Sequence, residues 1–222
     1  MRKILKCLLW GTILSSGSAC SGQKDTVSNV VAERKEVHQT KPKDLAGKAS
    51  AIKQSYLKVS RPHSANDEKE YFEQFPGSFD EFNSLFGYAE QDQSISSEFK
   101  AGPLYEESNI YIEAFFNLKE IGKITFYDKI IDISLGGKWF GDGVNYFSHG
   151  LEEKMTSDVS GFIETLAKRD SVQMSSFWYF YFDNVEPPEK IPVELIIIKE
   201  KNPAMFKLME NELEKVKVAR KE

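Results

Sequence analysis

Histidine and cysteine are scarce in this sequence, and their scarcity excludes several kinds of catalytic and metal site. The 222 residues include 3 His and 2 Cys. His149 is the only histidine between residues 67 and 222, so a multi-histidine metal site cannot form there. Cys7 and Cys20 both lie near the N-terminus, which excludes a cysteine nucleophile or a cysteine-bound metal in the rest of the chain. We therefore predict no metal site and no cofactor.

Near the N-terminus, no hydrophobic run is long enough to cross a bilayer. The apolar run of residues 7–14 has eight residues, whereas a membrane-spanning helix needs about 20. Basic residues precede this run and small residues follow it, which is typical of a processed export signal over residues 1–19. The alternative is a short buried helix. A composition with 41% hydrophobic and 28% charged residues also excludes collagens, coiled-coil rods and multispan membrane proteins.

The segment Gly17-Ser18-Ala19-Cys20 resembles the lipobox of bacterial lipoproteins. The resemblance implies that Cys20 is diacylated on its thiol and becomes the mature N-terminus, attached to the membrane by its lipid. The family usually has leucine where this chain has Gly17, and the nearest leucine here is Leu14. The alternative is an ordinary signal-peptidase site that ends at Ala19. Residues 21–22 lack the aspartate that retains lipoproteins at the inner membrane, so the resemblance implies an outer-membrane lipoprotein.

Aromatic residues and charge divide the remaining chain into two parts. Residues 21–66 contain one aromatic residue and carry a net charge of +5, from 9 basic and 4 acidic residues. Such a segment cannot bury enough apolar surface to offset its ordering entropy, so residues 20–66 are predicted to be a flexible basic tether. Apolar residues at helical spacing between 45 and 56 predict either a marginal helix on the domain edge or a basic helix touching lipid. His38 and His63 are interpreted as incidental.

Residues 67–222 are predicted to form a single, mostly α domain. This part contains all 16 Phe and has a net charge of −13, from 17 basic and 30 acidic residues. Capping residues and apolar spacing predict helix starts at Asn66, Ser78, Asp142, Asp158, Asp170 and Asn202, and further helices over 104–120 and 124–135. Two stretches are ambiguous: residues 177–182 are aromatic and residues 193–198 are β-branched. We expect a helix at 177–182, but two strands here would form a small hairpin near 177–198 and an α+β fold.

No strong catalytic motif is present in the predicted domain. Ser148 precedes His149, but a Gly-x-Ser-x-Gly elbow is missing, and the glycine loop at 136–143 lacks the Gly-Lys-Ser/Thr of a phosphate-binding loop. Asp128 and Asp132 are four residues apart on one predicted helix. They could hold a divalent cation, or perform acid/base chemistry with His149 in an envelope hydrolase, but the same spacing is typical of a solvated helix face.

The aromatic residues suggest a binding surface as the alternative to catalysis. Most of the 26 aromatic residues in 67–222 must form the core, but Trp139 and the Trp178, Tyr179 and Tyr181 group are of the kind enriched in binding hot spots. A net charge of −13 favours a basic or mixed-charge protein partner and disfavours nucleic acid.

Three segments of the predicted domain resemble a group of uncharacterised bacterial envelope proteins. They are residues 75–87, Gly137-Lys138-Trp139 and residues 176–183. That group often carries Gly-Pro-His after the final aspartate, where this chain has Asn184-Val185-Glu186. The resemblance implies one continuous domain and no assigned activity.

These observations lead to three functional hypotheses. The first is a lipid-anchored envelope binding module without catalytic activity, with a toxin-neutralising, immunity-type inhibitor as its specific version. The second is an envelope hydrolase that uses carboxylates and His149. The third is a structural subunit of an envelope assembly.

Overall fold

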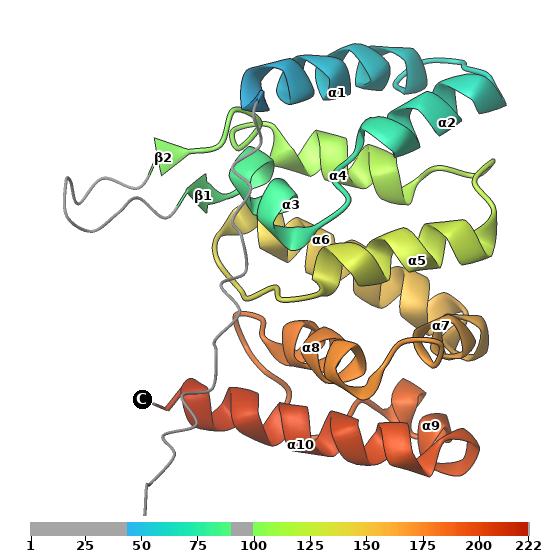
Figure 1. The fold of residues 1–222 in the computed structure, drawn as a ribbon, viewed down its shortest axis with the longest axis vertical. Helices are drawn as coiled ribbons and strands as arrows, with labels where there is room; N and C mark the ends of the chain where they lie inside the picture. Colours follow the sequence, from blue (N-terminus) through green and yellow to red (C-terminus); the bar gives the residue numbers. More distant parts are fainter. Residues whose placement is uncertain (1–43, 90–99, 222) are drawn as a thin grey trace, which may run out of the picture. The chain divides into compact units, whose positions relative to one another are not determined.

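The computed structural model describes residues 44–89 and 100–221, which are almost entirely helical (Figure 1). Its helices, in chain order, are α1 (Leu45–Val59), α2 (Ala65–Gln74), α3 (Phe79–Phe86), α4 (Ser108–Phe116), α5 (Lys123–Ser134), α6 (Asp142–Ser157), α7 (Val159–Leu166), α8 (Ser171–Phe182), the 3-10 turn η1 (Val193–Leu195), α9 (Ile197–Lys201) and α10 (Pro203–Ala219). The prediction of a single, mostly α domain is therefore confirmed. None of the described helices has the length and apolar character needed to cross a membrane.

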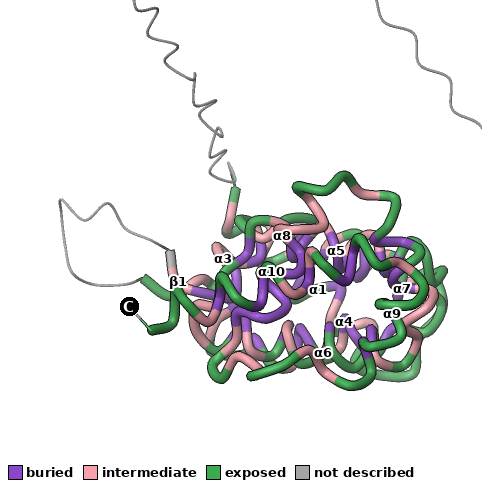
Figure 2. Tube along the Cα trace, turned by 90° about the horizontal axis from the view of Figure 1, so that it is seen from below, coloured by how far each residue is buried: buried purple, intermediate pink, exposed green. Residues whose placement is uncertain are grey.

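The helices are stacked along the longest axis of the domain, from α1 and α2 at one end to α9 and α10 at the other (Figure 1). Along this stack, α1 packs against α2, α4 against α6, α5 against α7, and both α8 and α9 against α10. Buried residues lie on the inner sides of the helices and exposed residues on their outer sides (Figure 2). The buried apolar side chains, from Ile52 of α1 to Val216 of α10, belong to one continuous cluster.

Phenylalanine rings form much of this core. The rings of Phe75 and Phe115 are stacked with their centroids 4.0 Å apart, and Phe115 is stacked on Phe126 at 4.9 Å. Phe75 directly follows α2, and Phe115 and Phe126 lie in α4 and α5, so the stacked rings join the end of α2 to two later helices.

Most helix starts follow the predicted caps. The side chains of Ser78, Asp158, Asp170 and Asn202 each accept a hydrogen bond from a backbone N–H in the first turn of the following helix. Three predicted helix boundaries differ from those of the structure. The cap of α2 is Ser64 rather than Asn66, α4 is shorter than residues 104–120, and Asp142 is the first residue of α6, after the cap residue Gly141.

The alternative of a β-hairpin near residues 177–198 is wrong, because these stretches are helical. Residues 177–182 belong to α8, and they show no helical stripe because five of these six side chains are buried. Residues 193–198 are divided between η1 and the start of α9. The only strands among the described residues are β1 (Tyr88–Ala89) and β2 (Lys100–Ala101), which pair antiparallel at a different place in the chain.

The predicted tether over residues 20–66 extends too far toward the C-terminus. Helix α1 packs against α2, and its Ala49 and Ile52 belong to the core, which agrees with the helix predicted on the domain edge between residues 45 and 56. The predicted signal over 1–19, Cys20, and the tether before residue 44 lie outside the described residues.

Candidate functional site

The aromatic group at Trp178, Tyr179 and Tyr181 does not form an exposed patch. Trp178 is fully buried and Tyr181 is 8% exposed, because α8 lies inside the stack and packs against α10. Tyr179 is half-buried at the edge of the core. Of these three side chains, only Tyr181 lines a groove that a ligand could enter.

Trp139 is half-buried and held from several sides. Its backbone N–H donates to Asp183 at 2.9 Å and its indole Nε1 donates to Asn145 at 2.6 Å. The guanidinium of Arg220 lies 5.0 Å from the indole ring centroid and also pairs with Asp183 at 2.7 Å. Trp139 therefore fastens the glycine loop to α6, α8 and the end of α10. The same loop has the positive φ angles that its glycines permit, at Gly136 (74°) and Gly141 (84°).

Asp128 and Asp132 share one arginine. The guanidinium of Arg169 lies 3.0 Å from a carboxylate oxygen of each aspartate. Burial raises the pKa of the Asp132 carboxyl, against the opposing effect of Arg169. His149 lines the groove described next, whereas neither aspartate does, so the structure does not bring the three predicted hydrolase residues together.

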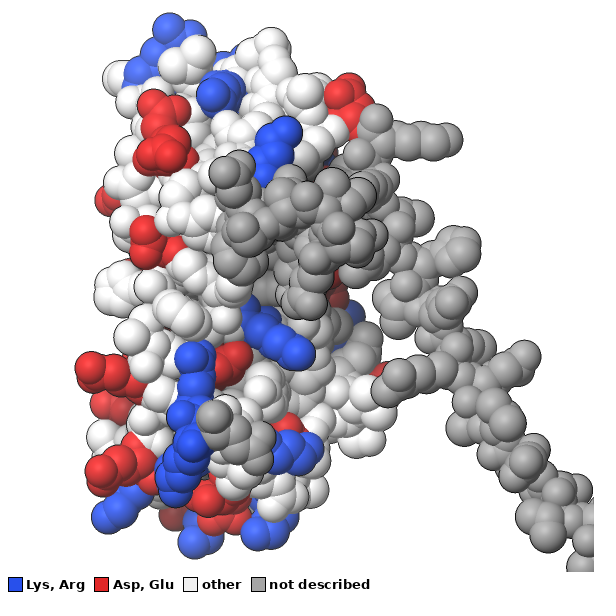
Figure 3. Space-filling view, turned by 90° about the vertical axis from the view of Figure 1, so that its left-hand side faces the viewer, with Lys and Arg blue, Asp and Glu red and all other residues white. Residues whose placement is uncertain are grey.

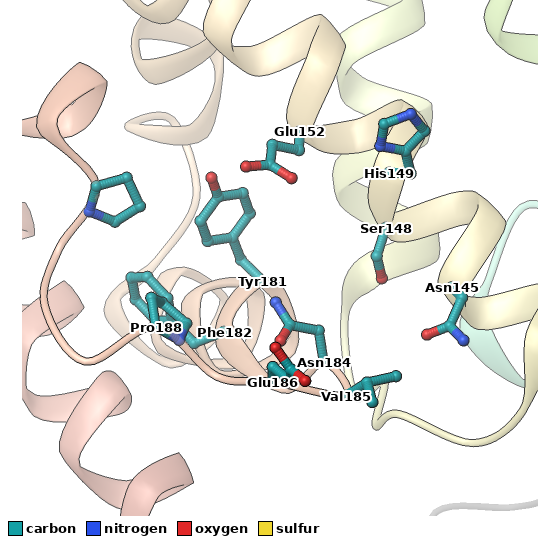
Figure 4. A pocket seen from close by; sticks show the side chains of 11 residues that line it. Asn145, Ser148, His149, Glu152, Tyr181, Phe182, Asn184, Val185, Glu186 and Pro188 are labelled. Carbon is teal, nitrogen blue, oxygen red and sulfur yellow. The ribbon is translucent and has the colours of Figure 1, made fainter.

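The candidate site is a groove of about 460 Å³ between α6 and the segment that follows α8 (Figure 4). Helix α6 contributes one wall, and the end of α8 with residues 184–192 forms the other. The lining residues are Asn145, Ser148, His149, Glu152, Tyr181, Phe182, Asn184, Val185, Glu186, Pro188 and Pro192. The lining thus combines carboxylates, amides and hydroxyls with an apolar surface of proline, valine and phenylalanine.

Several polar groups of this groove have no partner within the described part of the chain. The Ser148 hydroxyl oxygen is buried and makes no hydrogen bond there. The Tyr181 hydroxyl makes no hydrogen bond with a described residue, and the carboxylates of Glu152 and Glu186, which are exposed, form no ion pair with one. Burial, followed by the charges of Glu152 and Glu194, raises the pKa of the Tyr181 phenol well above its ordinary value, so Tyr181 stays neutral. A buried hydroxyl without a partner beside a groove, as at Ser148, is typical of a binding site.

Ser148 and His149 do not form a nucleophile and base pair. They are adjacent on α6, so their side chains leave the helix in different directions (Figure 4). The His149 ring is 73% exposed and lies 3.4 Å from Glu153. A serine nucleophile requires a base within hydrogen-bond reach, which Ser148 does not have among the described residues.

Charge is mixed on the face that Figure 3 shows. Acidic and basic side chains are interspersed over the coloured part of this face, and neither sign forms a broad patch there. The net charge of −13 over residues 67–222 therefore does not make this side of the domain uniformly acidic. Among residues 44–89 and 100–221, no three His, Cys, Asp or Glu side chains are grouped closely enough to hold a metal ion.

Sequence reasoning missed most of the groove. Asn145, Glu152, Glu186 and Pro188 all line the groove, and none of them was predicted as a site residue. The available signal was the Pro187-Pro188 pair a few residues after an aromatic helix, since proline fixes its φ angle and has no N–H to donate within a helix or sheet.

Comparison with known proteins gives no relative: no family model, no curated protein and no solved structure matches this chain.

Proposed function

We propose that this protein is a lipid-anchored binding module of the bacterial envelope, without catalytic activity, that receives a basic segment of a protein partner in the groove between α6 and residues 184–192. The observation that carries the proposal is the groove itself, where the buried Ser148 hydroxyl has no partner among the described residues and two exposed carboxylates form no ion pair with them. Glu152 and Glu186 supply negative charge, and phenylalanine, valine and proline supply apolar contact. An immunity-type inhibitor that holds a toxin is one form such a module takes.

A hydrolase is a weaker explanation of the same groove. Acyl transfer by serine needs an adjacent base, and Ser148 has none within the described chain. Carboxylate chemistry through Asp128 and Asp132 is also disfavoured, because both carboxylates pair with Arg169 and neither lines the groove. Binding requires only that the unpartnered groups be matched by a ligand.

The proposed anchor is the lipid on Cys20, at the outer membrane. The basic residues before the apolar run and the small residues before Cys20 support an exported, lipidated chain. The residues between Cys20 and α1 would then let the domain reach a partner near the membrane.

Metabolic labelling tests the anchor. Cells that express the full chain are grown with radiolabelled palmitate, and the Cys20→Ser variant is compared with Cys7→Ser as the matched control. We expect the wild-type chain and Cys7→Ser to carry label and sediment with membranes, and Cys20→Ser to lose both properties. Label retained by Cys20→Ser, or absent from the wild-type chain, contradicts the anchor.

Site-specific photo-crosslinking tests the binding function. A photoreactive amino acid is placed at Asn184 in the groove and, as a control, at Val172, which is 76% exposed at the start of α8. We expect one protein adduct at position 184, whose crosslinked peptide is identified by mass spectrometry and contains basic residues. An adduct that forms equally at position 172, or none at 184, is evidence against a binding groove.

A further inference from the structure

We infer that the groove between α6 and residues 184–192 is a pocket for a single arginine side chain carried by the protein partner. The inference rests on the proposed function and specifies the chemistry of its ligand. It depends on three observations at the same place: carboxylates on opposite walls, a buried tyrosine side chain whose hydroxyl has no partner among the described residues, and apolar walls.

The two carboxylates come from different elements, and both side chains are exposed to solvent. Glu152 lies on α6 and Glu186 on the segment after α8, and neither forms an ion pair with a described residue. Carboxylates held on two sides of one groove favour a cation between them. A guanidinium carries five N–H donors in a planar fork, so it can donate to both walls at once, whereas an ammonium is a compact point charge.

Tyr181 is an independent indication of a ligand. Its side chain is 8% exposed, it lines the groove, and its hydroxyl makes no hydrogen bond within the described chain. Figure 4 shows this hydroxyl directed toward the side of the groove that holds Glu152, and the charge of Glu152 acts on the phenol. A neutral phenol next to a carboxylate offers oxygen acceptors to the same guanidinium.

The remaining lining fits the rest of an arginine side chain. Phe182, Pro188 and Pro192 provide apolar surface for its methylene groups and for the flat face of the guanidinium. The volume of about 460 Å³ leaves space for part of the partner's backbone beside the side chain. The amide of Asn184 also lines the groove and can bond to that backbone.

Calorimetric titration tests the inference with defined probes. The full chain, purified in detergent, is titrated at low salt with acetyl-Gly-Arg-Gly-amide and with the same peptide containing citrulline or lysine. Citrulline keeps the shape of arginine and removes its charge. We expect the arginine peptide to bind at least about tenfold more tightly than the citrulline peptide and about threefold more tightly than the lysine peptide. Equal affinity for arginine and citrulline, or for arginine and lysine, overturns the inference.

Three variants locate the binding. Glu152→Gln should weaken binding of the arginine peptide about tenfold, and Tyr181→Phe, which removes only the hydroxyl, about threefold. Glu153→Gln is the matched control, since it removes the same charge one residue further along α6 at a side chain that does not line the groove. We expect it to change affinity less than twofold, with thermal melting checking that each variant is folded. Equal effects of Glu152→Gln and Glu153→Gln contradict the pocket.

The two proposals fail in different experiments. If position 184 crosslinks to a partner but the arginine peptide does not bind, the binding module stands and the arginine pocket is wrong. If neither experiment detects binding, both proposals are wrong.

Discussion

Glu68 is a buried carboxylate that is held by backbone hydrogen bonds and by His63. Its side chain is 5% exposed, and its carboxylate accepts hydrogen bonds from the backbone N–H groups of Lys119 and Glu120, both at 2.7 Å. Burial alone would raise the pKa of this carboxyl, but these N–H groups and His63 outweigh that effect and hold it below its ordinary value of 4.5. A single charged residue of α2 thereby fixes the loop between α4 and α5.

His63 is part of this arrangement, which corrects its interpretation as an incidental tether residue. Its Nε2 lies 3.0 Å from Glu68 and its Nδ1 lies 2.6 Å from the carbonyl oxygen of Arg61. Both ring nitrogens therefore face acceptors, and only the protonated ring can donate to both. The hydrogen bond to Glu68, followed by that to Arg61, raises the pKa of His63 above its ordinary value of 6.5.

The first prediction concerns the pH dependence of this pair. A raised folded-state pKa means that protonated His63 stabilises the fold below about pH 6.5, and that this contribution is lost as pH rises through the raised value. The lowered pKa of Glu68 means that its contribution is present above about pH 4.5 and is lost as pH falls through the lowered value. We expect His63→Ala to lower the melting temperature by about 2–4 °C between these limits, equivalent to about 1 kcal/mol, and by less at pH 9.

Circular dichroism melts from pH 4 to pH 9 measure this effect. His149→Ala is the control, because that ring is 73% exposed and faces an exposed glutamate. We expect the control to shift the melting temperature by less than about 1 °C at every pH. A His63→Ala deficit that is as large at pH 9 as at pH 6 would show that the ring acts by packing alone.

At the scale of the element, helix starts could be predicted because their determinants are local. A capping side chain bonds to a backbone N–H within three residues, so Asp170 and Gln173, which cap α8 reciprocally, are recognisable from the sequence. The predicted ends of α4 and the predicted cap of α2 were less accurate, because several polar residues near each end could cap the helix.

The candidate site was much harder to predict from the sequence. Its walls combine α6 with residues that follow α8, and the spatial neighbours of Glu152 and Tyr181 depend on how the helices stack. Periodicity distinguishes buried from exposed helix faces, but it does not say which helices meet. The aromatic run of α8 was misleading as a binding patch because its helix is buried on most sides.

The second prediction concerns the contact between α4 and α6. Gly150 is buried within α6, and a Cβ at this position would lie 2.3 Å from a ring carbon of Phe116 in α4. Alanine favours helices over glycine by about 1 kcal/mol, but this overlap costs more. We expect Gly150→Ala to lower the free energy of unfolding by about 1–3 kcal/mol.

Urea denaturation followed by circular dichroism measures this loss. Gly77→Ala is the control, since a Cβ there meets no atom within 4 Å. The control should change stability by less than about 0.5 kcal/mol. If Gly150→Ala is more stable than the wild-type chain, helix propensity outweighs the close approach, and α4 and α6 are less rigidly packed than described.

At the scale of the whole molecule, a continuous core joins the two ends of the stack. Ile52 in α1 and Val216 in α10 are both fully buried and belong to the same apolar cluster. Stacked helices whose interfaces were weak would unfold separately, as happens when cooperativity breaks down in long repeat arrays. One continuous aromatic and aliphatic core instead predicts that α1 and α8 unfold in a single transition.

The third prediction tests this cooperativity through Ile52→Ala, with Leu57→Ala, 62% exposed on the same helix, as the matched control. We expect Ile52→Ala to cost about 3 kcal/mol, which lowers the melting temperature by roughly 6–12 °C in a domain of this size.

In a Trp10→Phe background, tryptophan fluorescence reports on Trp139 and Trp178, which lie outside α1, and circular dichroism reports on all helices. The melting temperatures from the two signals should fall by the same amount in Ile52→Ala. Leu57→Ala should change neither melting temperature by more than about 1 °C. If circular dichroism shifts while fluorescence does not, α1 unfolds independently of α8, and the helical stack is not one cooperative unit.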